Sequence, residues 1–274
     1  MLAEFKSGAW LLPWHLLRQA WKRRRDDAVC RKRAIPEALW QLSVHRYPFI
    51  AARTHDELMR LRRLSTLFLA DKEFSGAGGM CVTDEVAVAV ALQACLPILN
   101  LGLSYYDGLK SIVLHPDEVL AQRVEMDENG VVHEYAEPLS GEAMQGGPVM
   151  LSWRDVAEAD ETAASAYNVV IHEFAHVLDM SQHGERARCL TPESRLLQQQ
   201  WLHALSKEYR GFADAVERET HSVLDPYGAQ SLQEFFAVAS EAFFVQPIEL
   251  QQAHSNLYAL MRDHYLQDPA ASMR

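Results

Sequence analysis

Two histidines and a glutamate stand at a spacing that suits zinc chemistry. Within Val169–Met180, His172 and His176 are four residues apart, so on a helix they lie on one face, one above the other. Imidazole nitrogens are zinc ligands, and Glu173 beside them can accept a proton from a metal-bound water. The pattern therefore predicts a helix that binds one zinc ion per chain and activates water.

The rest of this segment is apolar almost all the way round, which predicts a helix in the core. Its polar stripe consists of His172, Glu173, His176 and Asp179. A core helix whose histidines are merely hydrogen-bonded is the alternative. A metal ion is favoured because it satisfies polar groups that are costly to bury unpaired.

A catalytic zinc usually has three protein ligands and a position left for water, so one more ligand is needed. The helix expected from residue 231 carries two acidic residues on one face, Glu234 and Glu241, two turns apart. Ser231 and Glu234 also fit a capping box, in which the glutamate binds a backbone N–H and not a metal. Spacing alone leaves the third ligand open.

The composition is that of one large globular domain, or of a catalytic domain with an N-terminal helical layer. The 274 residues are 49% hydrophobic, which is enough for a sizeable core. Four cysteines without CxxC pairing indicate reduced thiols. No apolar run is long enough to span a membrane, and the first residues lack the charge order and cleavage site of a signal peptide. We therefore expect a cytoplasmic protein without a transmembrane segment.

The charges are distributed unevenly. Residues 1–63 carry 14 Lys and Arg against 6 Asp and Glu, although the whole chain has a net charge of −11, so the remainder is strongly acidic. The basic residues concentrate in 22–25 and 31–33. We expect residues 1–34 to form a basic segment with a solvated face that docks on the acidic body; a membrane surface or an acidic partner is the alternative. Direct nucleic-acid binding is not expected, because no recognisable binding module accompanies the charges.

Hydrophobic periodicity predicts an α+β chain that is mostly helical. Helices are expected over residues 14–24, 36–46, 55–73, 84–94 and 191–209, and from residues 231 and 247. Segments 111–115, 119–124, 131–135 and 149–153 have strand character and would form one small, mostly antiparallel sheet beside the metal helix. In a peptidase the strand nearest the metal can pair with an extended substrate. Segment 149–153 is the candidate, with an ordinary core strand as the alternative.

Several motifs resemble those of one bacterial enzyme family. The run His172-Glu-Phe-Ala-His-Val-Leu-Asp179, followed by Tyr227-Gly and Glu234-Phe-Phe-Ala, resembles the catalytic domain of anthrax lethal factor, a zinc endopeptidase. The closer resemblance is to the Mlc titration factor A family of bacterial zinc metallopeptidases, and it extends to Gln93–Asn100, Gly146–Trp153 and Gln267–Pro269. This resemblance implies a zincin-like metallopeptidase domain over residues 35–274.

The resemblance also implies a role for each residue of the site. His172, His176 and Glu234 would be the zinc ligands, with Glu173 as general base and Tyr227 facing the developing oxyanion. It further implies aminopeptidase-type cleavage of peptides and binding of a glucose-responsive transcriptional repressor. For Asp179 and Glu241 two roles stay open: orienting an imidazole, or holding the free amine of a substrate.

Two functions are therefore in competition. The leading hypothesis is a zinc-dependent peptidase of the aminopeptidase type. The alternative is a regulatory protein that binds and sequesters a transcriptional repressor, with peptidase activity secondary. Glu173 favours chemistry, because a structural zinc needs no base, whereas the basic N-terminal segment favours a protein partner. The two functions are compatible.

Overall fold

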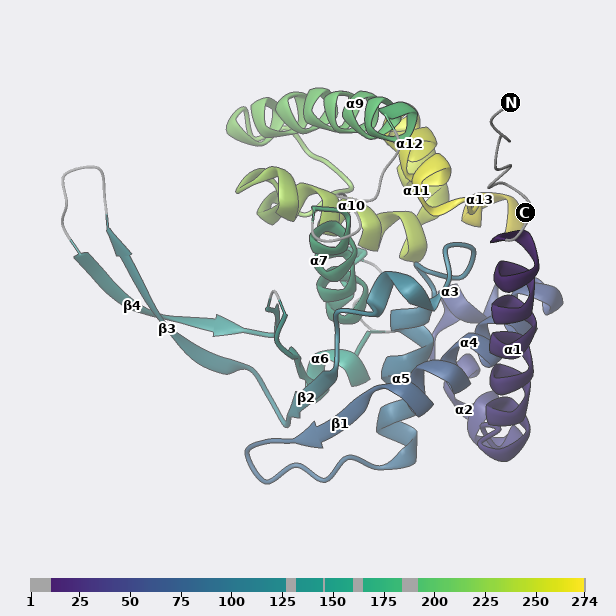
Figure 1. The fold of residues 1–274 in the computed structure, drawn as a ribbon. Coiled ribbons are helices and arrows are strands. Elements are labelled where there is room, and N and C mark those ends of the chain that lie inside the picture. Colours follow the sequence, from purple (N-terminus) through teal and green to yellow (C-terminus); the bar gives the residue numbers. More distant parts are fainter. Residues whose placement is uncertain (1–10, 127–131, 145, 160–164, 184–191, 274) are drawn as a thin grey trace, which may run out of the picture.

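The computed structural model describes residues 11–126, 132–144, 146–159, 165–183 and 192–273. The fold is α+β and mostly helical, as predicted, with a four-stranded sheet at the edge of the helical body (Figure 1). The N-terminal layer contains α1 (Leu11–Lys32), α2 (Glu37–Arg46), α3 (Pro48–Ala51) and α4 (His55–Asp71). The helices predicted in this part of the chain are confirmed, although α1 is longer than expected and α4 ends two residues earlier.

Helix α1 packs against α4, and its contact is not the one that the charges suggested. Asp27 of α1 forms an ion pair with Arg63 of α4 at 2.7 Å. The basic residues 22–25 and 31–33 are exposed at the surface. Asp27, an acidic residue of α1, therefore helps to hold α1 against α4. The two basic clusters of α1 face solvent.

The four-stranded sheet has the order β1-β2-β6-β5. Its strands are β1 (Glu73–Gly76), β2 (Ser111–His115), β5 (Gly141–Ala143) and β6 (Val149–Ser152). Strands β1 and β6 both run parallel to β2, and only β5 is antiparallel to its neighbour β6. The expectation of a mostly antiparallel arrangement is wrong for this sheet. The reason is connectivity, because α5 (Asp84–Cys95) carries the chain back between β1 and β2 and so makes them parallel.

Strands β3 (Val119–Met126) and β4 (Val132–Leu139) form a separate antiparallel pair. They project from the body (Figure 1). The prediction that these two segments belong to the same sheet as the other strands is therefore wrong. The turn predicted at 127–130 lies outside the described residues. Strand β1 was not predicted, because Glu73-Phe-Ser-Gly76 contains a single large apolar residue and gives no alternation.

Two helices that meet in the core carry the residues of interest. Helices α7 (Val169–His183) and α10 (Leu232–Val245) pack against each other, and α5 packs on α7. Phe174 of α7 and Phe243 of α10 are fully buried, and the alanines and valines of α5 lie in the same core, as predicted. The packing fixes α7 and α10 relative to each other.

The described residues also form the helices η1 (Leu103–Tyr106), α6 (Trp153–Ala157), α9 (Pro192–Glu217), η3 (Pro226–Ala229), α11 (Pro247–Ala253), α12 (Ser255–Tyr265) and α13 (Pro269–Ser272). Helices α9 and α12 pack on each other and on α10. The helices predicted over 191–209, from 231 and from 247 are confirmed, with α9 running further than expected. Helices α9 and α12 therefore cover α10, the helix that carries Glu234 and Glu241.

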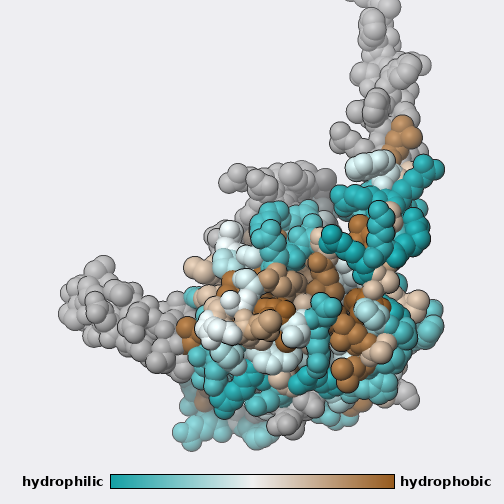
Figure 2. Space-filling view, turned by 90° about the horizontal axis from the view of Figure 1, so that it is seen from below, coloured by the Kyte–Doolittle hydropathy of each residue, from teal (hydrophilic) through white to brown (hydrophobic). Residues whose placement is uncertain are grey.

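Seen from below, hydrophobic residues gather near the middle of the face with hydrophilic residues around them (Figure 2). None of the described helices is both long and apolar enough to cross a membrane. Cys30, Cys81 and Cys95 are free thiols, and Cys189 lies outside the described residues.

Candidate metal centre

The start of α7 is fixed by Asn168, whose side-chain oxygen accepts a hydrogen bond from the Ile171 backbone N–H at 2.9 Å. From this start, His172 and His176 fall one turn apart, and their Nε2 atoms are 3.3 Å apart. The apolar faces of α7 are buried in the core. The helix is therefore held with both imidazoles directed at one point.

Glu234, in the first turn of α10, faces the same point. Its Oε2 atom lies 3.0 Å from Nε2 of His172 and 3.4 Å from Nε2 of His176. One ligand atom from each of these three residues lies within 4.8 Å of the other two. The packing of α10 on α7 thus assembles, from residues far apart in the sequence, a group of three that can hold a metal ion.

Only one of the two hydrogen bonds of a capping box is present between Ser231 and Glu234. Ser231 does cap α10, since its hydroxyl accepts a hydrogen bond from the Glu234 backbone N–H at 3.1 Å. The Glu234 carboxylate, however, contacts the two histidines. The backbone of Glu234 is used for capping, and its side chain is left for the site.

Glu241 contacts the opposite end of the His172 ring. Its Oε1 atom lies 2.8 Å from Nδ1 of His172, and its other oxygen accepts a hydrogen bond from the Asn168 backbone N–H. Because a carboxylate only accepts, this hydrogen bond places an imidazole proton on Nδ1, so Nε2 is the nitrogen that can meet Glu234 or a metal ion. Glu241 is therefore outside the group of three and directs Nε2 of His172 toward that group.

The donor set is suited to a cation. Nε2 of His172 and the carboxylate of Glu234 face each other across 3.0 Å, so a positive charge, either a proton on Nε2 or a metal ion, is needed between them. Burial alone would lower the pKa of His172, but Glu234 and Glu241 outweigh it and raise that pKa to about 10. Burial alone would raise the pKa of Glu234, yet the two imidazoles lower it to about 2. Two imidazoles and one carboxylate are a common ligand set of catalytic zinc, so these residues fit a metal.

Glu173 lies against β5 and is only 6% exposed. Gly141 makes room for it, because a Cβ atom at position 141 would lie 2.6 Å from Cγ of Glu173. Burial raises the pKa of Glu173 to about 7, although His172 and His176 oppose this shift. A carboxyl group with a pKa near neutrality can both accept and release a proton in this place.

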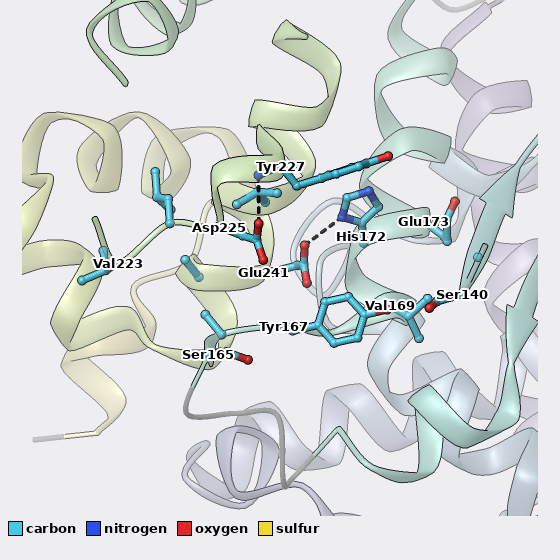
Figure 3. A pocket seen from close by; sticks show the side chains of 15 residues that line it. Ser140, Ser165, Tyr167, Val169, His172, Glu173, Val223, Asp225, Tyr227 and Glu241 are labelled. Atoms are coloured by element: carbon cyan, nitrogen blue, oxygen red, sulfur yellow. Dashed lines mark hydrogen bonds and ion pairs between the residues drawn. The ribbon is translucent and has the colours of Figure 1, made fainter. Parts of the chain in front are cut away.

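Helix η3 places Tyr227 near the His172 ring. The Asp225 carboxylate accepts a hydrogen bond from the Tyr227 backbone N–H at 2.8 Å and so holds the turn. The ring centroids of Tyr227 and His172 are 6.0 Å apart, and Tyr227 is 40% exposed. Figure 3 shows the tyrosine ring extending above His172. A purely structural role in the turn would explain the backbone hydrogen bond of Tyr227. It would not explain why the Tyr227 ring lies near the His172 imidazole.

A cavity of about 330 Å³ opens beside His172 (Figure 3). Its lining combines apolar side chains with acidic ones, including Val169, Val223, Leu224, Val238, Asp225, Glu173 and Glu241. Asp179 is not among the described lining residues. Both carboxylate oxygens of Glu241 are already hydrogen-bonded. Glu241 lines the cavity, and the role of holding a substrate amine stays a prediction for Glu241 and Asp179.

Segment 149–153 is not the strand that faces the site. Its main part, β6, lies between β2 and β5 and is paired on both sides. Within the described residues β5 pairs only with β6, and its first residue, Gly141, lines the cavity. The alternative of a core strand is correct for β6, and the edge strand near the site is β5.

The sequence interpretation missed three residues of this region. Gly141 has no side-chain signal and belongs to a strand of three residues. Asn168 could have been found, because an asparagine directly before a helical run is a common N-cap. The third missed residue is Gln93, whose buried side chain accepts a hydrogen bond from the Asn168 amide at 2.7 Å. This contact joins distant segments, so no local pattern reveals it.

The fold and the donor set together define the class of protein. Two histidines of one buried helix, a glutamate of a second helix, and another glutamate directly after the first histidine form the site of a metallopeptidase. The chain belongs to the family described as glucose-regulated metallo-peptidase M90, which matches residues 18–266.

Relatives of similar length support the same assignment. A protein of Synechocystis sp., described as uncharacterised, is 35% identical over 234 residues, which are 84% of each chain. Mlc titration factor A of Pectobacterium atrosepticum is 30% identical over 237 residues, 86% of this chain and 88% of that one. Mlc titration factor A of Cronobacter sakazakii is 31% identical over 229 residues, 83% of this chain and 85% of that one. The family resemblance stated from the motifs is confirmed.

Proposed function

We propose that this chain is a cytoplasmic zinc-dependent peptidase of the aminopeptidase type. The observation that carries the proposal is the convergence of His172, His176 and Glu234, with Glu173 buried beside them. We assign the catalytic domain to residues 35–274 and treat residues 1–34 as a separate basic segment. The aminopeptidase type rests on the family resemblance.

The three converging residues would hold one zinc ion. When bound, zinc polarises the scissile carbonyl and lowers the pKa of a water that it contacts. Glu241 fixes the ring of His172 through Nδ1, and Asn168 holds Glu241 in turn. Asp179, three residues after His176, remains a candidate for orienting an imidazole.

Glu173 would act as the general base. It follows His172 directly, and burial raises its pKa to about 7. Its carboxylate would therefore accept a proton from the attacking water. The same group can then deliver that proton to the leaving amine. Tyr227 would donate its hydroxyl hydrogen to the oxygen on which negative charge develops, since its ring lies near His172.

The substrate backbone would pair with β5. This strand offers the edge of the sheet that lies closest to Glu173, and its other edge is taken by β6. An extended peptide that adds to such an edge gains backbone hydrogen bonds regardless of its sequence. Affinity would then come from the strand, and selectivity from the cavity beside it.

Metal analysis with a substrate panel tests this proposal. We expect one zinc ion per chain, and cleavage of chromogenic amino-acid and unblocked peptide substrates that a chelator abolishes and added zinc restores. N-acetylated peptides should be cleaved far more slowly if the enzyme is an aminopeptidase. Cleavage that survives complete removal of metal would contradict the proposal. Preference for blocked internal peptide bonds would replace the aminopeptidase type by an endopeptidase.

Gly141→Ala should lower kcat by about 100-fold without unfolding the protein. The added Cβ atom would lie 2.6 Å from Cγ and 2.7 Å from Oε1 of Glu173, so the carboxylate must move. Gly108→Ala is a matched control, because a Cβ atom there meets nothing within 4 Å. Steady-state rates and thermal unfolding of both variants are the measurement. Equal activity of the two would show that Glu173 does not need its present position.

A second role, binding of a transcriptional repressor, is proposed beside the first. Two relatives carry the name Mlc titration factor A, which describes a protein that titrates Mlc. In this chain the exposed side of α1 offers basic residues 22–25 next to Trp21, which is 70% exposed. An exposed tryptophan beside positive charges is typical of a surface that binds a protein partner.

A further inference from the structure

We propose that the cavity beside the metal centre receives the side chain that follows the scissile bond, and that Asp225 selects a long cationic side chain, Lys or Arg, at that position. The inference rests on the proposed peptidase function and names its substrate class. It assigns to Asp225 a role that is separate from the hydrolytic step.

The direction of β5 determines which part of a substrate meets the cavity. Gly141, the first residue of β5, and Ser140 directly before it line the cavity, whereas Ala143 at the end of β5 does not. A peptide adds to β5 in the antiparallel direction, as β6 does on the other side, because antiparallel pairing is the more stable per residue. The C-terminal part of the substrate then lies at the start of β5, and the residue after the scissile bond faces the cavity.

The cavity has the chemistry of a site for a long amphipathic side chain. Val169, Leu224 and Val238 supply apolar walls for an alkyl stem. Three acidic residues, Glu173, Asp225 and Glu241, line the same space, and its described lining contains no Lys or Arg. Its volume of about 330 Å³ is sufficient for one large side chain. An acidic side chain would be repelled there, and a short one would leave the cavity unfilled.

Asp225 is the carboxylate that can reach a ligand. Glu241 is buried, with both oxygens hydrogen-bonded to His172 and Asn168. Asp225 is exposed at the cavity and uses one oxygen to accept the Tyr227 backbone N–H at 2.8 Å. In Figure 3 its carboxylate lies beside that of Glu241. The second oxygen of Asp225 can therefore bind an ammonium or guanidinium group.

The test uses peptides Ala-X-Gly-Gly in which X is Lys, norleucine or Glu, each with a free and an acetylated N-terminus. Norleucine matches the stem of Lys without its charge. For the zinc-loaded wild-type protein we expect kcat/KM for Lys to exceed that for norleucine by about 10-fold, with Glu the poorest. Asp225→Asn keeps an oxygen for the Tyr227 backbone N–H and removes the charge, so the Lys to norleucine ratio should fall to about 1. Asp214→Asn, an exposed change on α9 outside the cavity lining, should keep the wild-type ratio.

Three results would overturn the inference. The first is a wild-type ratio near 1, and the second is a ratio that survives Asp225→Asn. The third is an Asp225→Asn variant that loses activity on every free-amine peptide equally while cleaving acetylated ones normally, since Asp225 would then hold the substrate's own amine. If no peptide is cleaved, the proposed function fails separately. Calorimetric titration of zinc-loaded Glu173→Gln with the uncleaved Lys and norleucine peptides then decides, with tighter binding of the Lys peptide expected.

Discussion

Glu173→Gln should lower the turnover of peptide substrates by about 10²–10⁴-fold while leaving the metal bound. The substitution keeps the size of the side chain and its place beside Gly141, so the buried contacts of α7 with β5 persist. What is lost is the carboxylate that accepts the proton of the attacking water. None of the three residues that converge on the metal position is altered.

The measurement combines single-turnover kinetics with determination of zinc content and of thermal unfolding. Full activity in the variant would exclude Glu173 as the base, and loss of zinc would mean that it serves the metal instead. The same variant separates the two proposed roles. Its binding to a repressor of the Mlc type should equal that of the wild-type protein, because the exposed face of α1 is unchanged.

The core of the site could be predicted because its signals are local. The spacing of His172, Glu173 and His176 sets their common face, and the apolar residues around them predict a buried helix. The same reasoning located α10 and its two glutamates. Long helices with a clear hydrophobic period can be predicted reliably, because burial of their apolar faces supplies most of their stability.

The sheet around the site could not be predicted to the same degree. Strand directions depend on which segments lie between the strands, and β1 and β5 are too short to show a period. The position of Gly141 against Glu173 is a contact between segments 32 residues apart in the sequence. Such contacts are set by packing, so the edge strand near the site was assigned to the wrong segment.

The choice between Glu234 and Glu241 shows why the third ligand needed the structure. Seven residues place both glutamates on one face of α10, about 10 Å apart along the helix. An imidazole has two nitrogens on different edges, and the two carboxylates approach His172 from these two edges: Glu234 at Nε2 and Glu241 at Nδ1. Only Glu234 is also near His176. The sequence establishes the shared face but not which edge of the ring each carboxylate meets.

Glu234→Gln should therefore weaken zinc binding more than Glu241→Gln, although the two changes are chemically identical. Loss of a carboxylate that only hydrogen-bonds a ligand typically costs about 10–100-fold in metal affinity, and this is the effect expected for Glu241→Gln. Glu234→Gln removes the charge of the third ligand itself, so its loss should exceed about 100-fold. Zinc affinity is measured by competition with a chelator of known affinity, with far-ultraviolet circular dichroism as the check on folding.

The two variants also differ in what should remain. In Glu241→Gln the three ligand atoms still converge, so saturating zinc should restore the metal and much of the activity. In Glu234→Gln the two histidines alone face the metal, and a site with two protein ligands does not hold zinc as a catalytic centre does. If Glu241→Gln lost the metal and Glu234→Gln kept it, Nδ1 of His172 and Glu241 would be the ligands, and the convergence at Nε2 would have another purpose.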